Sequence, residues 1–434
     1  METHFSPEQL AESDLATAAA VIDKCVHCGF CNATCPTYLI SQDETDGPRG
    51  RIGIMQSLLE TGRDPTAAEL DSLDRCLTCQ SCHSTCSAGV EYTHLLGITR
   101  NRLERRRLRP WKQAKLRKML AETLPDPAKF ARRQALARLA RPLAGLLPPP
   151  LPALIDMSRP HDTASGPVAP GLYRPEGEGE AKRRVLLMTG CVQNRLDTDI
   201  DQATVRLLTR LGAEVLVPPA HGCCGALGEH LGHTDDALSH ASRMVDAWTA
   251  ATLRFPVDAV VVNASGCGFH IRDWGHHFRD DPRRSATAAR FAGMVEDVAK
   301  TALSLGISAP SPVAEVAAWP VALHIPCSQV HGMGVYMEPK SALEAVGFTA
   351  TFAEDLHICC GAAGTYSLFQ PTVAATLKTQ KLEKLTATGG KVIASGNMGC
   401  NAHLRTDAAV PVVHVAQLLD WATGGPRPAA LSPA

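Results

Sequence analysis

Short hydrophobic runs separated by loops and helix-length stretches fill the second half of the chain. Each run is rich in β-branched residues and bounded by turn residues, a pattern that predicts a strand. Strands that alternate with helices are typical of α/β sheets. The predicted strands cover residues 184–188, 213–217, 257–262, 321–325, 350–352 and 391–394.

The first hundred residues follow a different pattern, with helix-forming stretches such as 52–59 and few β-branched runs. Residues 142–175 are rich in proline, which is typical of a connector because proline cannot donate to a helix or sheet ladder. The pattern predicts an α+β multidomain protein. We expect an α-helical domain over 1–100, a basic helical and Pro-rich connector over 101–182, and α/β domains over 183–312 and 313–434.

Composition agrees with a globular protein that buries large cores. The chain has 434 residues, of which 45% are hydrophobic and 20% charged. Residues 1–15 are acidic and polar without the apolar region of a secretory signal, and no apolar run is long enough to span a bilayer. We therefore expect a cytoplasmic protein whose membrane association, if any, is peripheral.

Sixteen cysteines point to metal binding. The first eight form two runs of the pattern Cys-x2-Cys-x2-Cys-x3-Cys, and the second run repeats the first at an offset of 51 residues. Bacterial two-cluster ferredoxins have this pattern, and the fourth cysteine of each run binds the other run's cluster. We expect one [4Fe–4S] cluster on Cys25, Cys28, Cys31 and Cys86, and a second on Cys76, Cys79, Cys82 and Cys35.

Two details bear on this assignment. Pro36 follows the first run as in the ferredoxin pattern, whereas Ser87 replaces the second proline, which changes local rigidity and not the ligands. A pair of structural zinc sites is the alternative, since zinc also takes four thiolates. Zinc needs only two Cys-x2-Cys pairs, so the extra cysteine of each run favours iron–sulfur clusters.

The other eight cysteines mark a tandem repeat in the α/β region. Cys191, Cys223, Cys224 and Cys267 precede Cys327, Cys359, Cys360 and Cys400 by 136, 136, 136 and 133 residues. Each set follows predicted strands and contains the sequence Cys-Cys-Gly, so we name the two halves the first and second Cys-Cys-Gly domain. Ligands bind parallel sheets at the carboxyl ends of strands, where these thiols would converge.

A metal or cluster site is therefore predicted in each Cys-Cys-Gly domain. His270 follows Cys267 at the same step as His403 follows Cys400, which makes both histidines possible further ligands. The alternative is that the cysteines are small buried hydrophobic residues and the histidines hydrogen-bonded helix residues. His276 and His277 are expected to pack or face solvent.

Positive charge is concentrated in residues 100–141, which hold fifteen basic and three acidic residues in a chain of net charge −1. This segment, with Arg105, Arg106 and Arg107 at its centre, could contact anionic lipid headgroups or acidic partner subunits, or form a solvated face. Nucleic acid is not expected, because aromatic residues do not interleave with the charge. No complete phosphate or dinucleotide motif occurs, so we expect neither flavin nor nicotinamide on this chain.

Two ferredoxin runs followed by two Cys-Cys-Gly domains resemble the iron–sulfur subunit of glycolate oxidase over nearly the whole chain. The segments that carry the resemblance are 25–38, 46–52, 74–79, 264–268 and 357–366. The resemblance implies an electron-transfer subunit that takes electrons from flavin-bearing partner subunits, which oxidise glycolate to glyoxylate. It further implies delivery toward quinone or another membrane acceptor, at the cytoplasmic face of the inner membrane.

Related families with the same plan give the alternatives. They are the iron–sulfur subunits of lactate-utilisation systems and of anaerobic glycerol-3-phosphate dehydrogenase, and the catalytic subunit of heterodisulfide reductase, which performs thiol/disulfide chemistry. In the last family the domain ends in Cys-x2-Cys and five thiolates hold a non-cubane cluster. Here His270 and His403 stand at the final position, so an additional iron–sulfur cluster, a zinc ion or a mixed Cys/His site are all compatible with the ligands.

Overall fold

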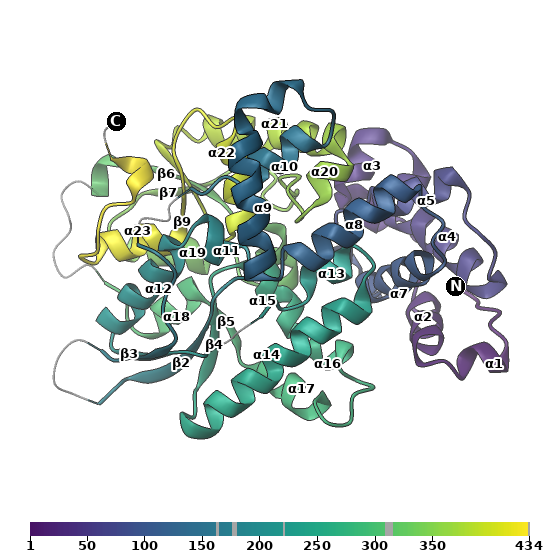
Figure 1. The fold of residues 1–434 in the computed structure, drawn as a ribbon, viewed down its shortest axis with the longest axis horizontal. Coiled ribbons are helices and arrows are strands. Elements are labelled where there is room, and N and C mark those ends of the chain that lie inside the picture. Colours follow the sequence, from purple (N-terminus) through teal and green to yellow (C-terminus); the bar gives the residue numbers. More distant parts are fainter. Residues whose placement is uncertain (162–164, 176–179, 220–221, 309–315, 433–434) are drawn as a thin grey trace.

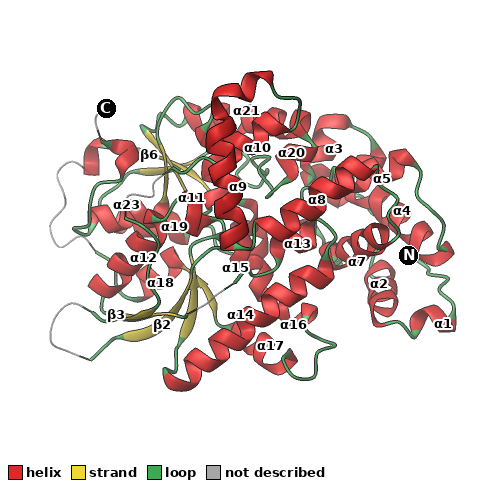
Figure 2. Cartoon of the chain, in the orientation of Figure 1, coloured by secondary structure: helices red, strands yellow, loops and turns green. Residues whose placement is uncertain are grey.

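The chain folds into a helical domain and two mainly parallel sheets. The computed structural model describes residues 1–161, 165–175, 180–219, 222–308 and 316–432. The helical domain lies on one side and both sheets lie on the other (Figure 1). Helices cover the two sheets and dominate the molecule (Figure 2). The predicted α+β multidomain class is confirmed.

The N-terminal domain is entirely helical. Its core is formed by apolar side chains that recur at helical spacing, among them Leu15 and Ile22 on α2, Met55 on α4 and Leu95 on α7. Its elements are α1 (Pro7–Leu10), α2 (Ser13–Asp23), η1 (Phe30–Thr34), α3 (Pro36–Ser41), η2 (Glu44–Asp46), α4 (Pro48–Thr61), α5 (Ala67–Asp74), α6 (Ser81–Thr85) and α7 (Tyr92–Arg105).

The connector begins as a helical hairpin that lies over the sheets. It contains α8 (Trp111–Thr123), α9 (Pro127–Ala140), η3 (Arg141–Leu146) and α10 (Leu151–Met157). Its end belongs to the first sheet, because β1 (Gly171–Tyr173) pairs antiparallel with β3 and Val168 is buried in the core. Val168 and β1 thus pack with the first sheet, although they precede the boundary that we expect at residue 182.

The first Cys-Cys-Gly domain has a five-stranded sheet of order β1-β3-β2-β4-β5, parallel except for β1. The central strand β2 is buried from Val185 to Met188, as expected for a parallel strand covered on both faces. The elements after β1 are β2 (Arg183–Met188), α11 (Gln193–Leu196), α12 (Asp199–Arg210), β3 (Ala213–Val217), α13 (Ala226–His230), α14 (Thr234–Arg254), β4 (Ala259–Val262), α15 (Ser265–Arg272), α16 (Trp274–His277), α17 (Ser285–Gly293), β5 (Val295–Asp297) and α18 (Val298–Ser304).

The second Cys-Cys-Gly domain repeats this plan with a four-stranded parallel sheet of order β7-β6-β8-β9. Without β1, the first sheet has the same order, so the repeat predicted from cysteine spacing is also a repeat of topology. The elements are η4 (Val316–Ala318), β6 (Val321–His324), η5 (Ser328–Gly332), α19 (Glu338–Ala345), β7 (Ala350–Phe352), α20 (Tyr366–Phe369), α21 (Pro371–Ala387), β8 (Val392–Ser395), α22 (Met398–Arg405), β9 (Val412–His414), α23 (Val415–Ala422) and η6 (Ala429–Leu431).

The two Cys-Cys-Gly domains share one hydrophobic core. A single cluster of buried side chains runs from Val185 and Leu207 in the first domain to Leu323 and Trp421 in the second. Asp420 on α23 accepts hydrogen bonds from Arg206 and Arg210 on α12 at 2.7 and 2.9 Å. Because burial of this shared surface stabilises both halves together, we expect them to unfold as one unit.

Much of the charge in the basic segment is neutralised within the chain. Arg109 and Arg117 are buried and pair with Asp74, and Arg109 also pairs with Glu104. Arg105 pairs with Asp235 in the first Cys-Cys-Gly domain, and Arg106 pairs with Asp64 in the helical domain. Within the described ranges, every helix is too short or too polar to cross a lipid bilayer.

Candidate iron–sulfur and cysteine-rich sites

The eight N-terminal cysteines surround two adjacent cavities. Cys25, Cys28, Cys31 and Cys86 line one cavity, whereas Cys35, Cys76 and Cys79 line the other. Cys82 lies in the wall between them and lines both. The fourth cysteine of each run thus lies with the first three of the other run, an arrangement that supports crossed ligation.

Both ferredoxin loops have the same uncommon backbone. In the first, His27 and Gly29 have φ of 60° and 85°, and in the second, Thr78 and Gln80 have φ of 53° and 68°. Positive φ strains a residue with a side chain and persists where the surrounding structure requires it. Here the left-handed residues alternate with the cysteines, so that each loop curls around its cavity.

The donor atoms at these cavities fit a cationic iron–sulfur core. Burial, followed by the neighbouring Cys25 thiol, raises the pKa of Cys31 to about 11. Burial also raises the pKa of Cys79 and Cys82 well above the usual thiol value. Such thiols keep their protons unless a cation compensates the charge, so loading with iron must release protons.

Arg51 and Tyr92 line the second cavity from within the core. The Arg51 guanidinium donates to Ser72 O at 2.8 Å and to Thr37 Oγ1 at 3.1 Å, and lies 3.5 Å from Asp46. Burial opposes its charge, but Tyr92, Cys76, Cys35 and Asp46 outweigh burial and raise its pKa. A fixed positive charge therefore stands beside the second ferredoxin site, where it favours reduction of a bound cluster.

In each Cys-Cys-Gly domain the four thiols form a continuous chain of contacts. The order is Cys191, Cys223, Cys224 and Cys267 in the first domain, and Cys327, Cys359, Cys360 and Cys400 in the second. The hydrogen bond to Cys223, together with burial, raises the pKa of Cys224, and the bond to Cys359 acts in the same way on Cys327. Cys224 and Cys327 therefore also need a cation before they ionise, whereas hydrogen bonds from Cys191 and Cys224 lower the pKa of Cys223.

The backbone conformation requires glycine at the third position of each Cys-Cys-Gly sequence. Gly225 and Gly361 have φ of 106° and 90°, and the amide of each donates to the first cysteine sulfur of its pair at 3.4 Å. A Cβ on Gly361 would lie 2.6 Å from Ala374 O, and one on Gly225 would lie 3.0 Å from Ala237 O. Glycine therefore permits both the turn and the close approach of the next helix.

His324 is the histidine that lies among cysteines. Among the described residues, one set of three or more His, Cys, Asp or Glu ligand atoms lies within 4.8 Å of one another, and it consists of His324, Cys360 and Cys400. Burial lowers the pKa of His324 to about 3, and its Nδ1 lies 3.0 Å from Ser395 Oγ. A neutral imidazole oriented in this way leaves Nε2 as a potential ligand.

The histidines predicted as further ligands lie elsewhere. His270 is buried beside the backbone of Gly225 and lines a cavity between the helical domain and the first Cys-Cys-Gly domain. His403 lines a second, larger cavity, and its Nε2 is a buried nitrogen without a hydrogen-bond partner among the described residues. Neither belongs to the three-ligand set around His324.

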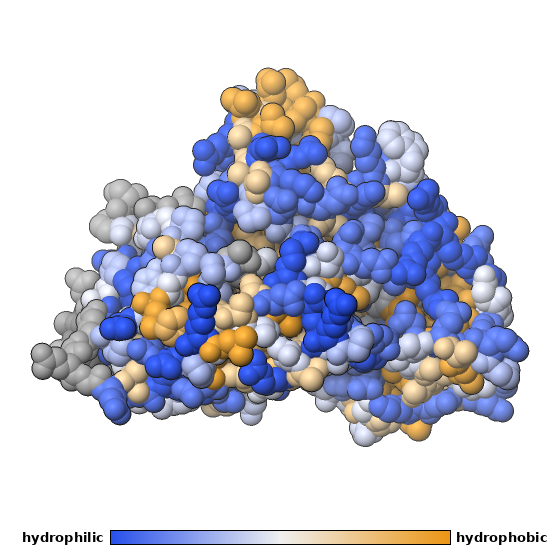
Figure 3. Space-filling model, turned by 60° about the horizontal axis from the view of Figure 1, so that its bottom comes forward, coloured by the Kyte–Doolittle hydropathy of each residue, from blue (hydrophilic) through white to orange (hydrophobic). Residues whose placement is uncertain are grey.

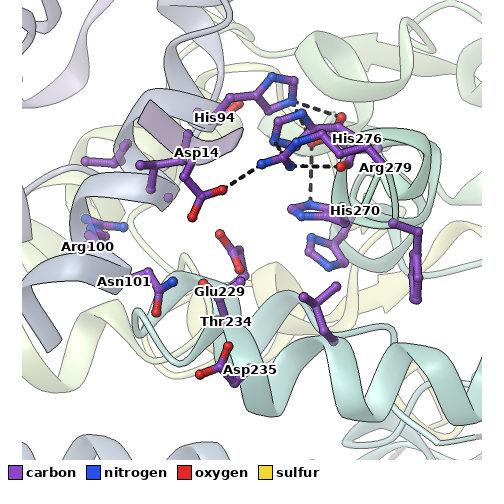
Figure 4. A pocket seen from close by; sticks show the side chains of 18 of the residues that line it. Asp14, His94, Arg100, Asn101, Glu229, Thr234, Asp235, His270, His276 and Arg279 are labelled. Carbon is purple, nitrogen blue, oxygen red and sulfur yellow. Dashed lines mark hydrogen bonds and ion pairs between the residues drawn. The ribbon is translucent and has the colours of Figure 1, made fainter. Parts of the chain in front are cut away.

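The cavity that contains His270 has a volume of about 360 Å³ and is strongly polar. His94 on α7 stacks on His276 with ring centroids 3.6 Å apart, and its Nε2 lies 2.9 Å from Asp273 Oδ2. Arg279 donates to Asp14 at 2.6 Å across the domain boundary (Figure 4). Ion pairs and histidines therefore hold the first Cys-Cys-Gly domain to the helical domain.

The two cysteine sites face different neighbours. In the second domain, Cys327 and Cys359 pack in one apolar cluster with Leu77 and Cys79 of the second ferredoxin loop. In the first domain, all four cysteines line a cavity of about 1450 Å³ that α8, α9 and α10 cover. The sites adjoin each other, since Ser265 Oγ lies 2.8 Å from Ser328 Oγ.

These contacts define an order of centres through the molecule. The first ferredoxin loop lies nearest the surface, where Cys28 is exposed beside Val26 and Phe30, which are 71% and 67% exposed. The second ferredoxin loop follows, then the second Cys-Cys-Gly site, and finally the first Cys-Cys-Gly site at its cavity. Redox centres bound at these four sites would form a series that can carry electrons in single steps across the protein.

Two family models match the regions just described. The model of the 4Fe-4S dicluster domain matches residues 21–90, and that of the cysteine-rich domain matches residues 185–272 and 321–405. The chain is 34% identical over 426 residues to the glycolate oxidase iron-sulfur subunit of Escherichia coli (strain K12), with 97% of this chain and 99% of the relative covered. It is 27% identical to the probable glycolate oxidase iron-sulfur subunit of Bacillus subtilis (strain 168), covering 92% and 94%.

Further similarities are more partial. Lactate utilization protein A of Bacillus subtilis (strain 168) is 29% identical over 244 residues, which is 55% of this chain and 99% of that protein. Among solved structures, a hypothetical protein from Helicobacter pylori matches with a TM-score of 0.52 and 10% identity, over 96% of this chain and 73% of that one. The last similarity concerns the fold alone.

Sequence reasoning missed three features of these sites. His324 precedes Cys327 by three residues on a predicted strand, but its counterpart in the first domain is Met188, so the repeat gave no signal for it. Arg51 lies in a segment that carries the family resemblance, yet only the fold brings it to the second ferredoxin loop. The large cavity depends on how α8 to α10 lie over the first domain, which residue patterns do not specify.

Proposed function

Because this chain belongs to the family of the glycolate oxidase iron–sulfur subunit, we propose that it is the electron-transfer subunit of a glycolate oxidase complex. Flavin-bearing partner subunits would oxidise glycolate to glyoxylate, and this chain would carry the electrons toward quinone. The observation that carries the proposal is the series of four cysteine sites, which runs from an exposed ferredoxin loop to the cavity beneath α8, α9 and α10.

Four sets of residues of this chain would each bind one centre. Crossed thiolate sets, Cys25, Cys28, Cys31, Cys86 and Cys76, Cys79, Cys82, Cys35, would hold two [4Fe–4S] clusters, which accept and release single electrons. Cys327, Cys359, Cys360 and Cys400 with His324, and Cys191, Cys223, Cys224 and Cys267, would hold two further centres, as iron–sulfur clusters or zinc. The thiol pKa shifts favour loading at neutral and higher pH.

The exposed end of the series would contact the flavin partner. Phe30 and Val26 project beside Cys28, and exposed aromatic residues are common anchors in protein interfaces. Changing Phe30 to glutamate should slow reduction of the chain by glycolate through the partner but leave reduction by dithionite unchanged. Leu253, which is exposed on the first Cys-Cys-Gly domain, provides the control substitution Leu253→Glu.

Reconstitution of the complex tests the proposal directly. The loaded chain is mixed with its flavin partner subunits, and bleaching of the iron–sulfur absorbance is followed after addition of glycolate, L-lactate or glycerol 3-phosphate. Bleaching by glycolate that disappears in Cys31→Ser supports the proposal. Bleaching by L-lactate alone would favour the lactate alternative, for which the similarity to lactate utilization protein A is the supporting observation.

A thiol/disulfide enzyme is the second candidate, because the first Cys-Cys-Gly site opens to a cavity that could admit a substrate. That enzyme would reduce a disulfide with electrons from the ferredoxin clusters without any flavin partner. Turnover of disulfides by the isolated, dithionite-reduced chain would favour it over glycolate-linked electron transfer. Iron and zinc analysis of the same preparation identifies the metal in the Cys-Cys-Gly domains.

A further inference from the structure

Residues 127–157, which comprise α9, η3 and α10, form a cap whose outer tip is unusually apolar. Leu139, Leu143 and Leu146 are 78%, 55% and 84% exposed, and we call these three residues the leucine tip. Figure 3 shows hydrophobic residues gathered at this end of the molecule. Leu136 and Leu151, which are also exposed, continue the apolar surface toward the body of the protein.

Basic residues surround the leucine tip. The cap contains five basic residues and one acidic residue. Arg132, Arg133 and Arg138 are exposed on α9, and within the described chain no carboxylate pairs with them. They differ in this from Arg105 and Arg106, which are paired within the molecule. Protruding leucines flanked by free arginines suit the boundary of an anionic bilayer, where apolar side chains enter the acyl region and arginines meet phosphates.

The cap also covers the large cavity of about 1450 Å³. Leu136, Leu147 and Leu151 line the cavity where it meets the cap and are themselves partly or fully exposed, so the cavity continues into the apolar surface beside the leucine tip. Further inside, Leu120, Phe130 and other apolar residues line it. Small-molecule pockets are typically about 300–1,000 Å³, so this one can hold a ring together with part of a long hydrocarbon chain.

The inner end of the cavity is lined by cysteines and a histidine instead of leucines. Cys191, Cys223, Cys224 and Cys267 of the first Cys-Cys-Gly domain line it there, and His403 of the second domain faces it. The Nε2 atom of His403 is buried and has no hydrogen-bond partner among the described residues. A ring nitrogen that can bond a ligand and a cluster of four cysteines therefore lie at the end of an apolar channel.

From this arrangement we propose that the leucine tip enters the membrane and that the cavity binds a lipid-soluble quinone drawn from the bilayer. The proposal rests on the proposed electron-transfer function and names the place where electrons leave the chain. Reduction of one quinone consumes two electrons, which the partner's flavin supplies through the cysteine sites, and two protons from water, and it yields one quinol. His403 Nε2 would accept a hydrogen bond from a quinol hydroxyl.

Vesicle binding tests the membrane contact. The purified full chain is floated with vesicles of phosphatidylethanolamine and phosphatidylglycerol, without flavin partners, for wild type, the triple variant Leu139→Glu, Leu143→Glu, Leu146→Glu, and the control Leu253→Glu. We expect the triple variant to lose at least about tenfold in partitioning, since three apolar side chains become charged, and the control to match wild type. Equal binding of the triple variant, or a wild-type chain that needs its partners to bind, would overturn the membrane contact.

Photoaffinity labelling with an azido-substituted short-chain quinone tests the cavity. Labelled peptides should contain residues that line the cavity, which fall within 119–161, 190–197, 223–230, 264–267, 362–368, 397–417 and 428–430 or at Lys378, and unlabelled quinone should compete. Ala137 lines the cavity and Ala135 on the same helix is exposed outside it, so Ala137→Trp should lose most labelling while Ala135→Trp keeps it. Labelling elsewhere, or labelling that competitor does not reduce in the wild-type chain, would overturn the cavity assignment whether or not Ala137→Trp folds.

The two assays distinguish this inference from the proposed function. Neither contains glycolate or a flavin subunit, so an incorrect substrate assignment leaves both results unchanged. Conversely, a chain that is reduced by glycolate through its partner but binds neither vesicles nor quinone would keep the proposed function and refute this inference.

Discussion

The two Cys-Cys-Gly domains have the same sheet order and the same chain of four thiols, but their cysteines face opposite surroundings. In the second domain, Cys327 and Cys359 pack against the second ferredoxin loop, and Cys360 and Cys400 are buried in a separate apolar cluster. In the first domain they line a large apolar cavity beneath the cap. One duplicated geometry can therefore serve an inner position and an outer position in the same path, because what each site contacts is set by neighbouring elements and not by the repeat itself.

One difference between the two domains is a histidine in the second at the position where the first has a methionine. His324 in the second domain and Met188 in the first are separated by 136 residues, the offset that relates Cys327 to Cys191. Substituting each of these two residues by the other should give the largest difference between the two domains. His324→Met should weaken metal retention in the second domain by about 100-fold, because a direct ligand is lost. Metal analysis after graded chelation measures the effect.

The matched variant is Met188→His. It places an imidazole at the same strand end of the first domain and should leave metal retention in the second domain at the wild-type level. If His324→Met retains metal as tightly as Met188→His, then His324 is a buried, hydrogen-bonded histidine and not a ligand.

Access to the cysteines should differ by about tenfold in the metal-free chain. Cys267 lines the cavity and is partly exposed, whereas its counterpart Cys400 is buried in an apolar cluster. A lipophilic maleimide should therefore modify Cys267 about ten times faster than Cys400, since reaction requires both access and ionisation. Peptide mass spectrometry at timed quenches measures both rates, and equal rates would remove the distinction between an open and an enclosed site.

Acid should loosen the contact of the helical domain with the first Cys-Cys-Gly domain before its contact with the second. Burial lowers the pKa of His276 to about 3 and of His230 to about 4 at the first contact. The opened form has ordinary histidine values and binds more protons below about pH 6.5, so stability is full above pH 6.5 and is lost as pH falls toward 4. The cost at pH 5 is on the order of 1–2 kcal/mol per histidine.

Hydrogen exchange measures this difference. Between pH 7 and 5, and after correction for the intrinsic exchange rate, protection of α15 and α16 should fall several-fold. Protection of α20 and α21 should change less, because their contact with the second ferredoxin loop is built from apolar residues such as Leu77 and Tyr366. Parallel loss at both contacts would show that the histidines do not distinguish them.

The smallest expected effect concerns the charge beside the second ferredoxin site. Arg51→Met removes a buried cation and should lower the potential of that cluster by on the order of tens of millivolts. Arg49, which is more exposed and pairs with Glu44, is the matched control. Redox titration followed by electron paramagnetic resonance measures the potential of this cluster in both variants. An equal shift of the potential in Arg49→Met would mean that the burial of Arg51 does not strengthen its effect on the cluster.

Residue patterns predicted well those features of the fold that depend on residues close together in the sequence. Hydrophobic runs located β2, β3, β4, β6, β7 and β8 to within one or two residues, because buried parallel strands are continuous apolar segments. Among the described strands, β1, β5, β7 and β9 have three residues each, and of these only β7 was predicted, because so short a run carries little periodicity. The basic segment left lipid headgroups, partner subunits and a solvated face as alternatives, but Arg109 and Arg117 are buried against Asp74, a contact between residues distant in sequence.

The candidate sites divide in the same way. Cysteine spacing predicted four sets of cysteines whose thiols lie together in the structure, because repeated spacing is a property of the sequence itself, and ligation by these sets stays a prediction. It also suggested His270 and His403 as ligands, whereas the structure brings His324 to Cys360 and Cys400. Which residue of a helix or strand end reaches a neighbouring cysteine depends on packing, and packing also creates the cavity at the first domain.

The order of the two Cys-Cys-Gly sites is tested most directly by blocking one site at a time. The complex with its flavin partners is reduced with glycolate, and the redox state of each remaining centre is followed by freeze-quench spectroscopy in Cys360→Ala and Cys224→Ala. If the second domain is the inner site, Cys360→Ala leaves the first-domain centre oxidised, whereas Cys224→Ala still allows reduction of the second-domain centre. Prompt reduction of the first-domain centre in Cys360→Ala would contradict this order.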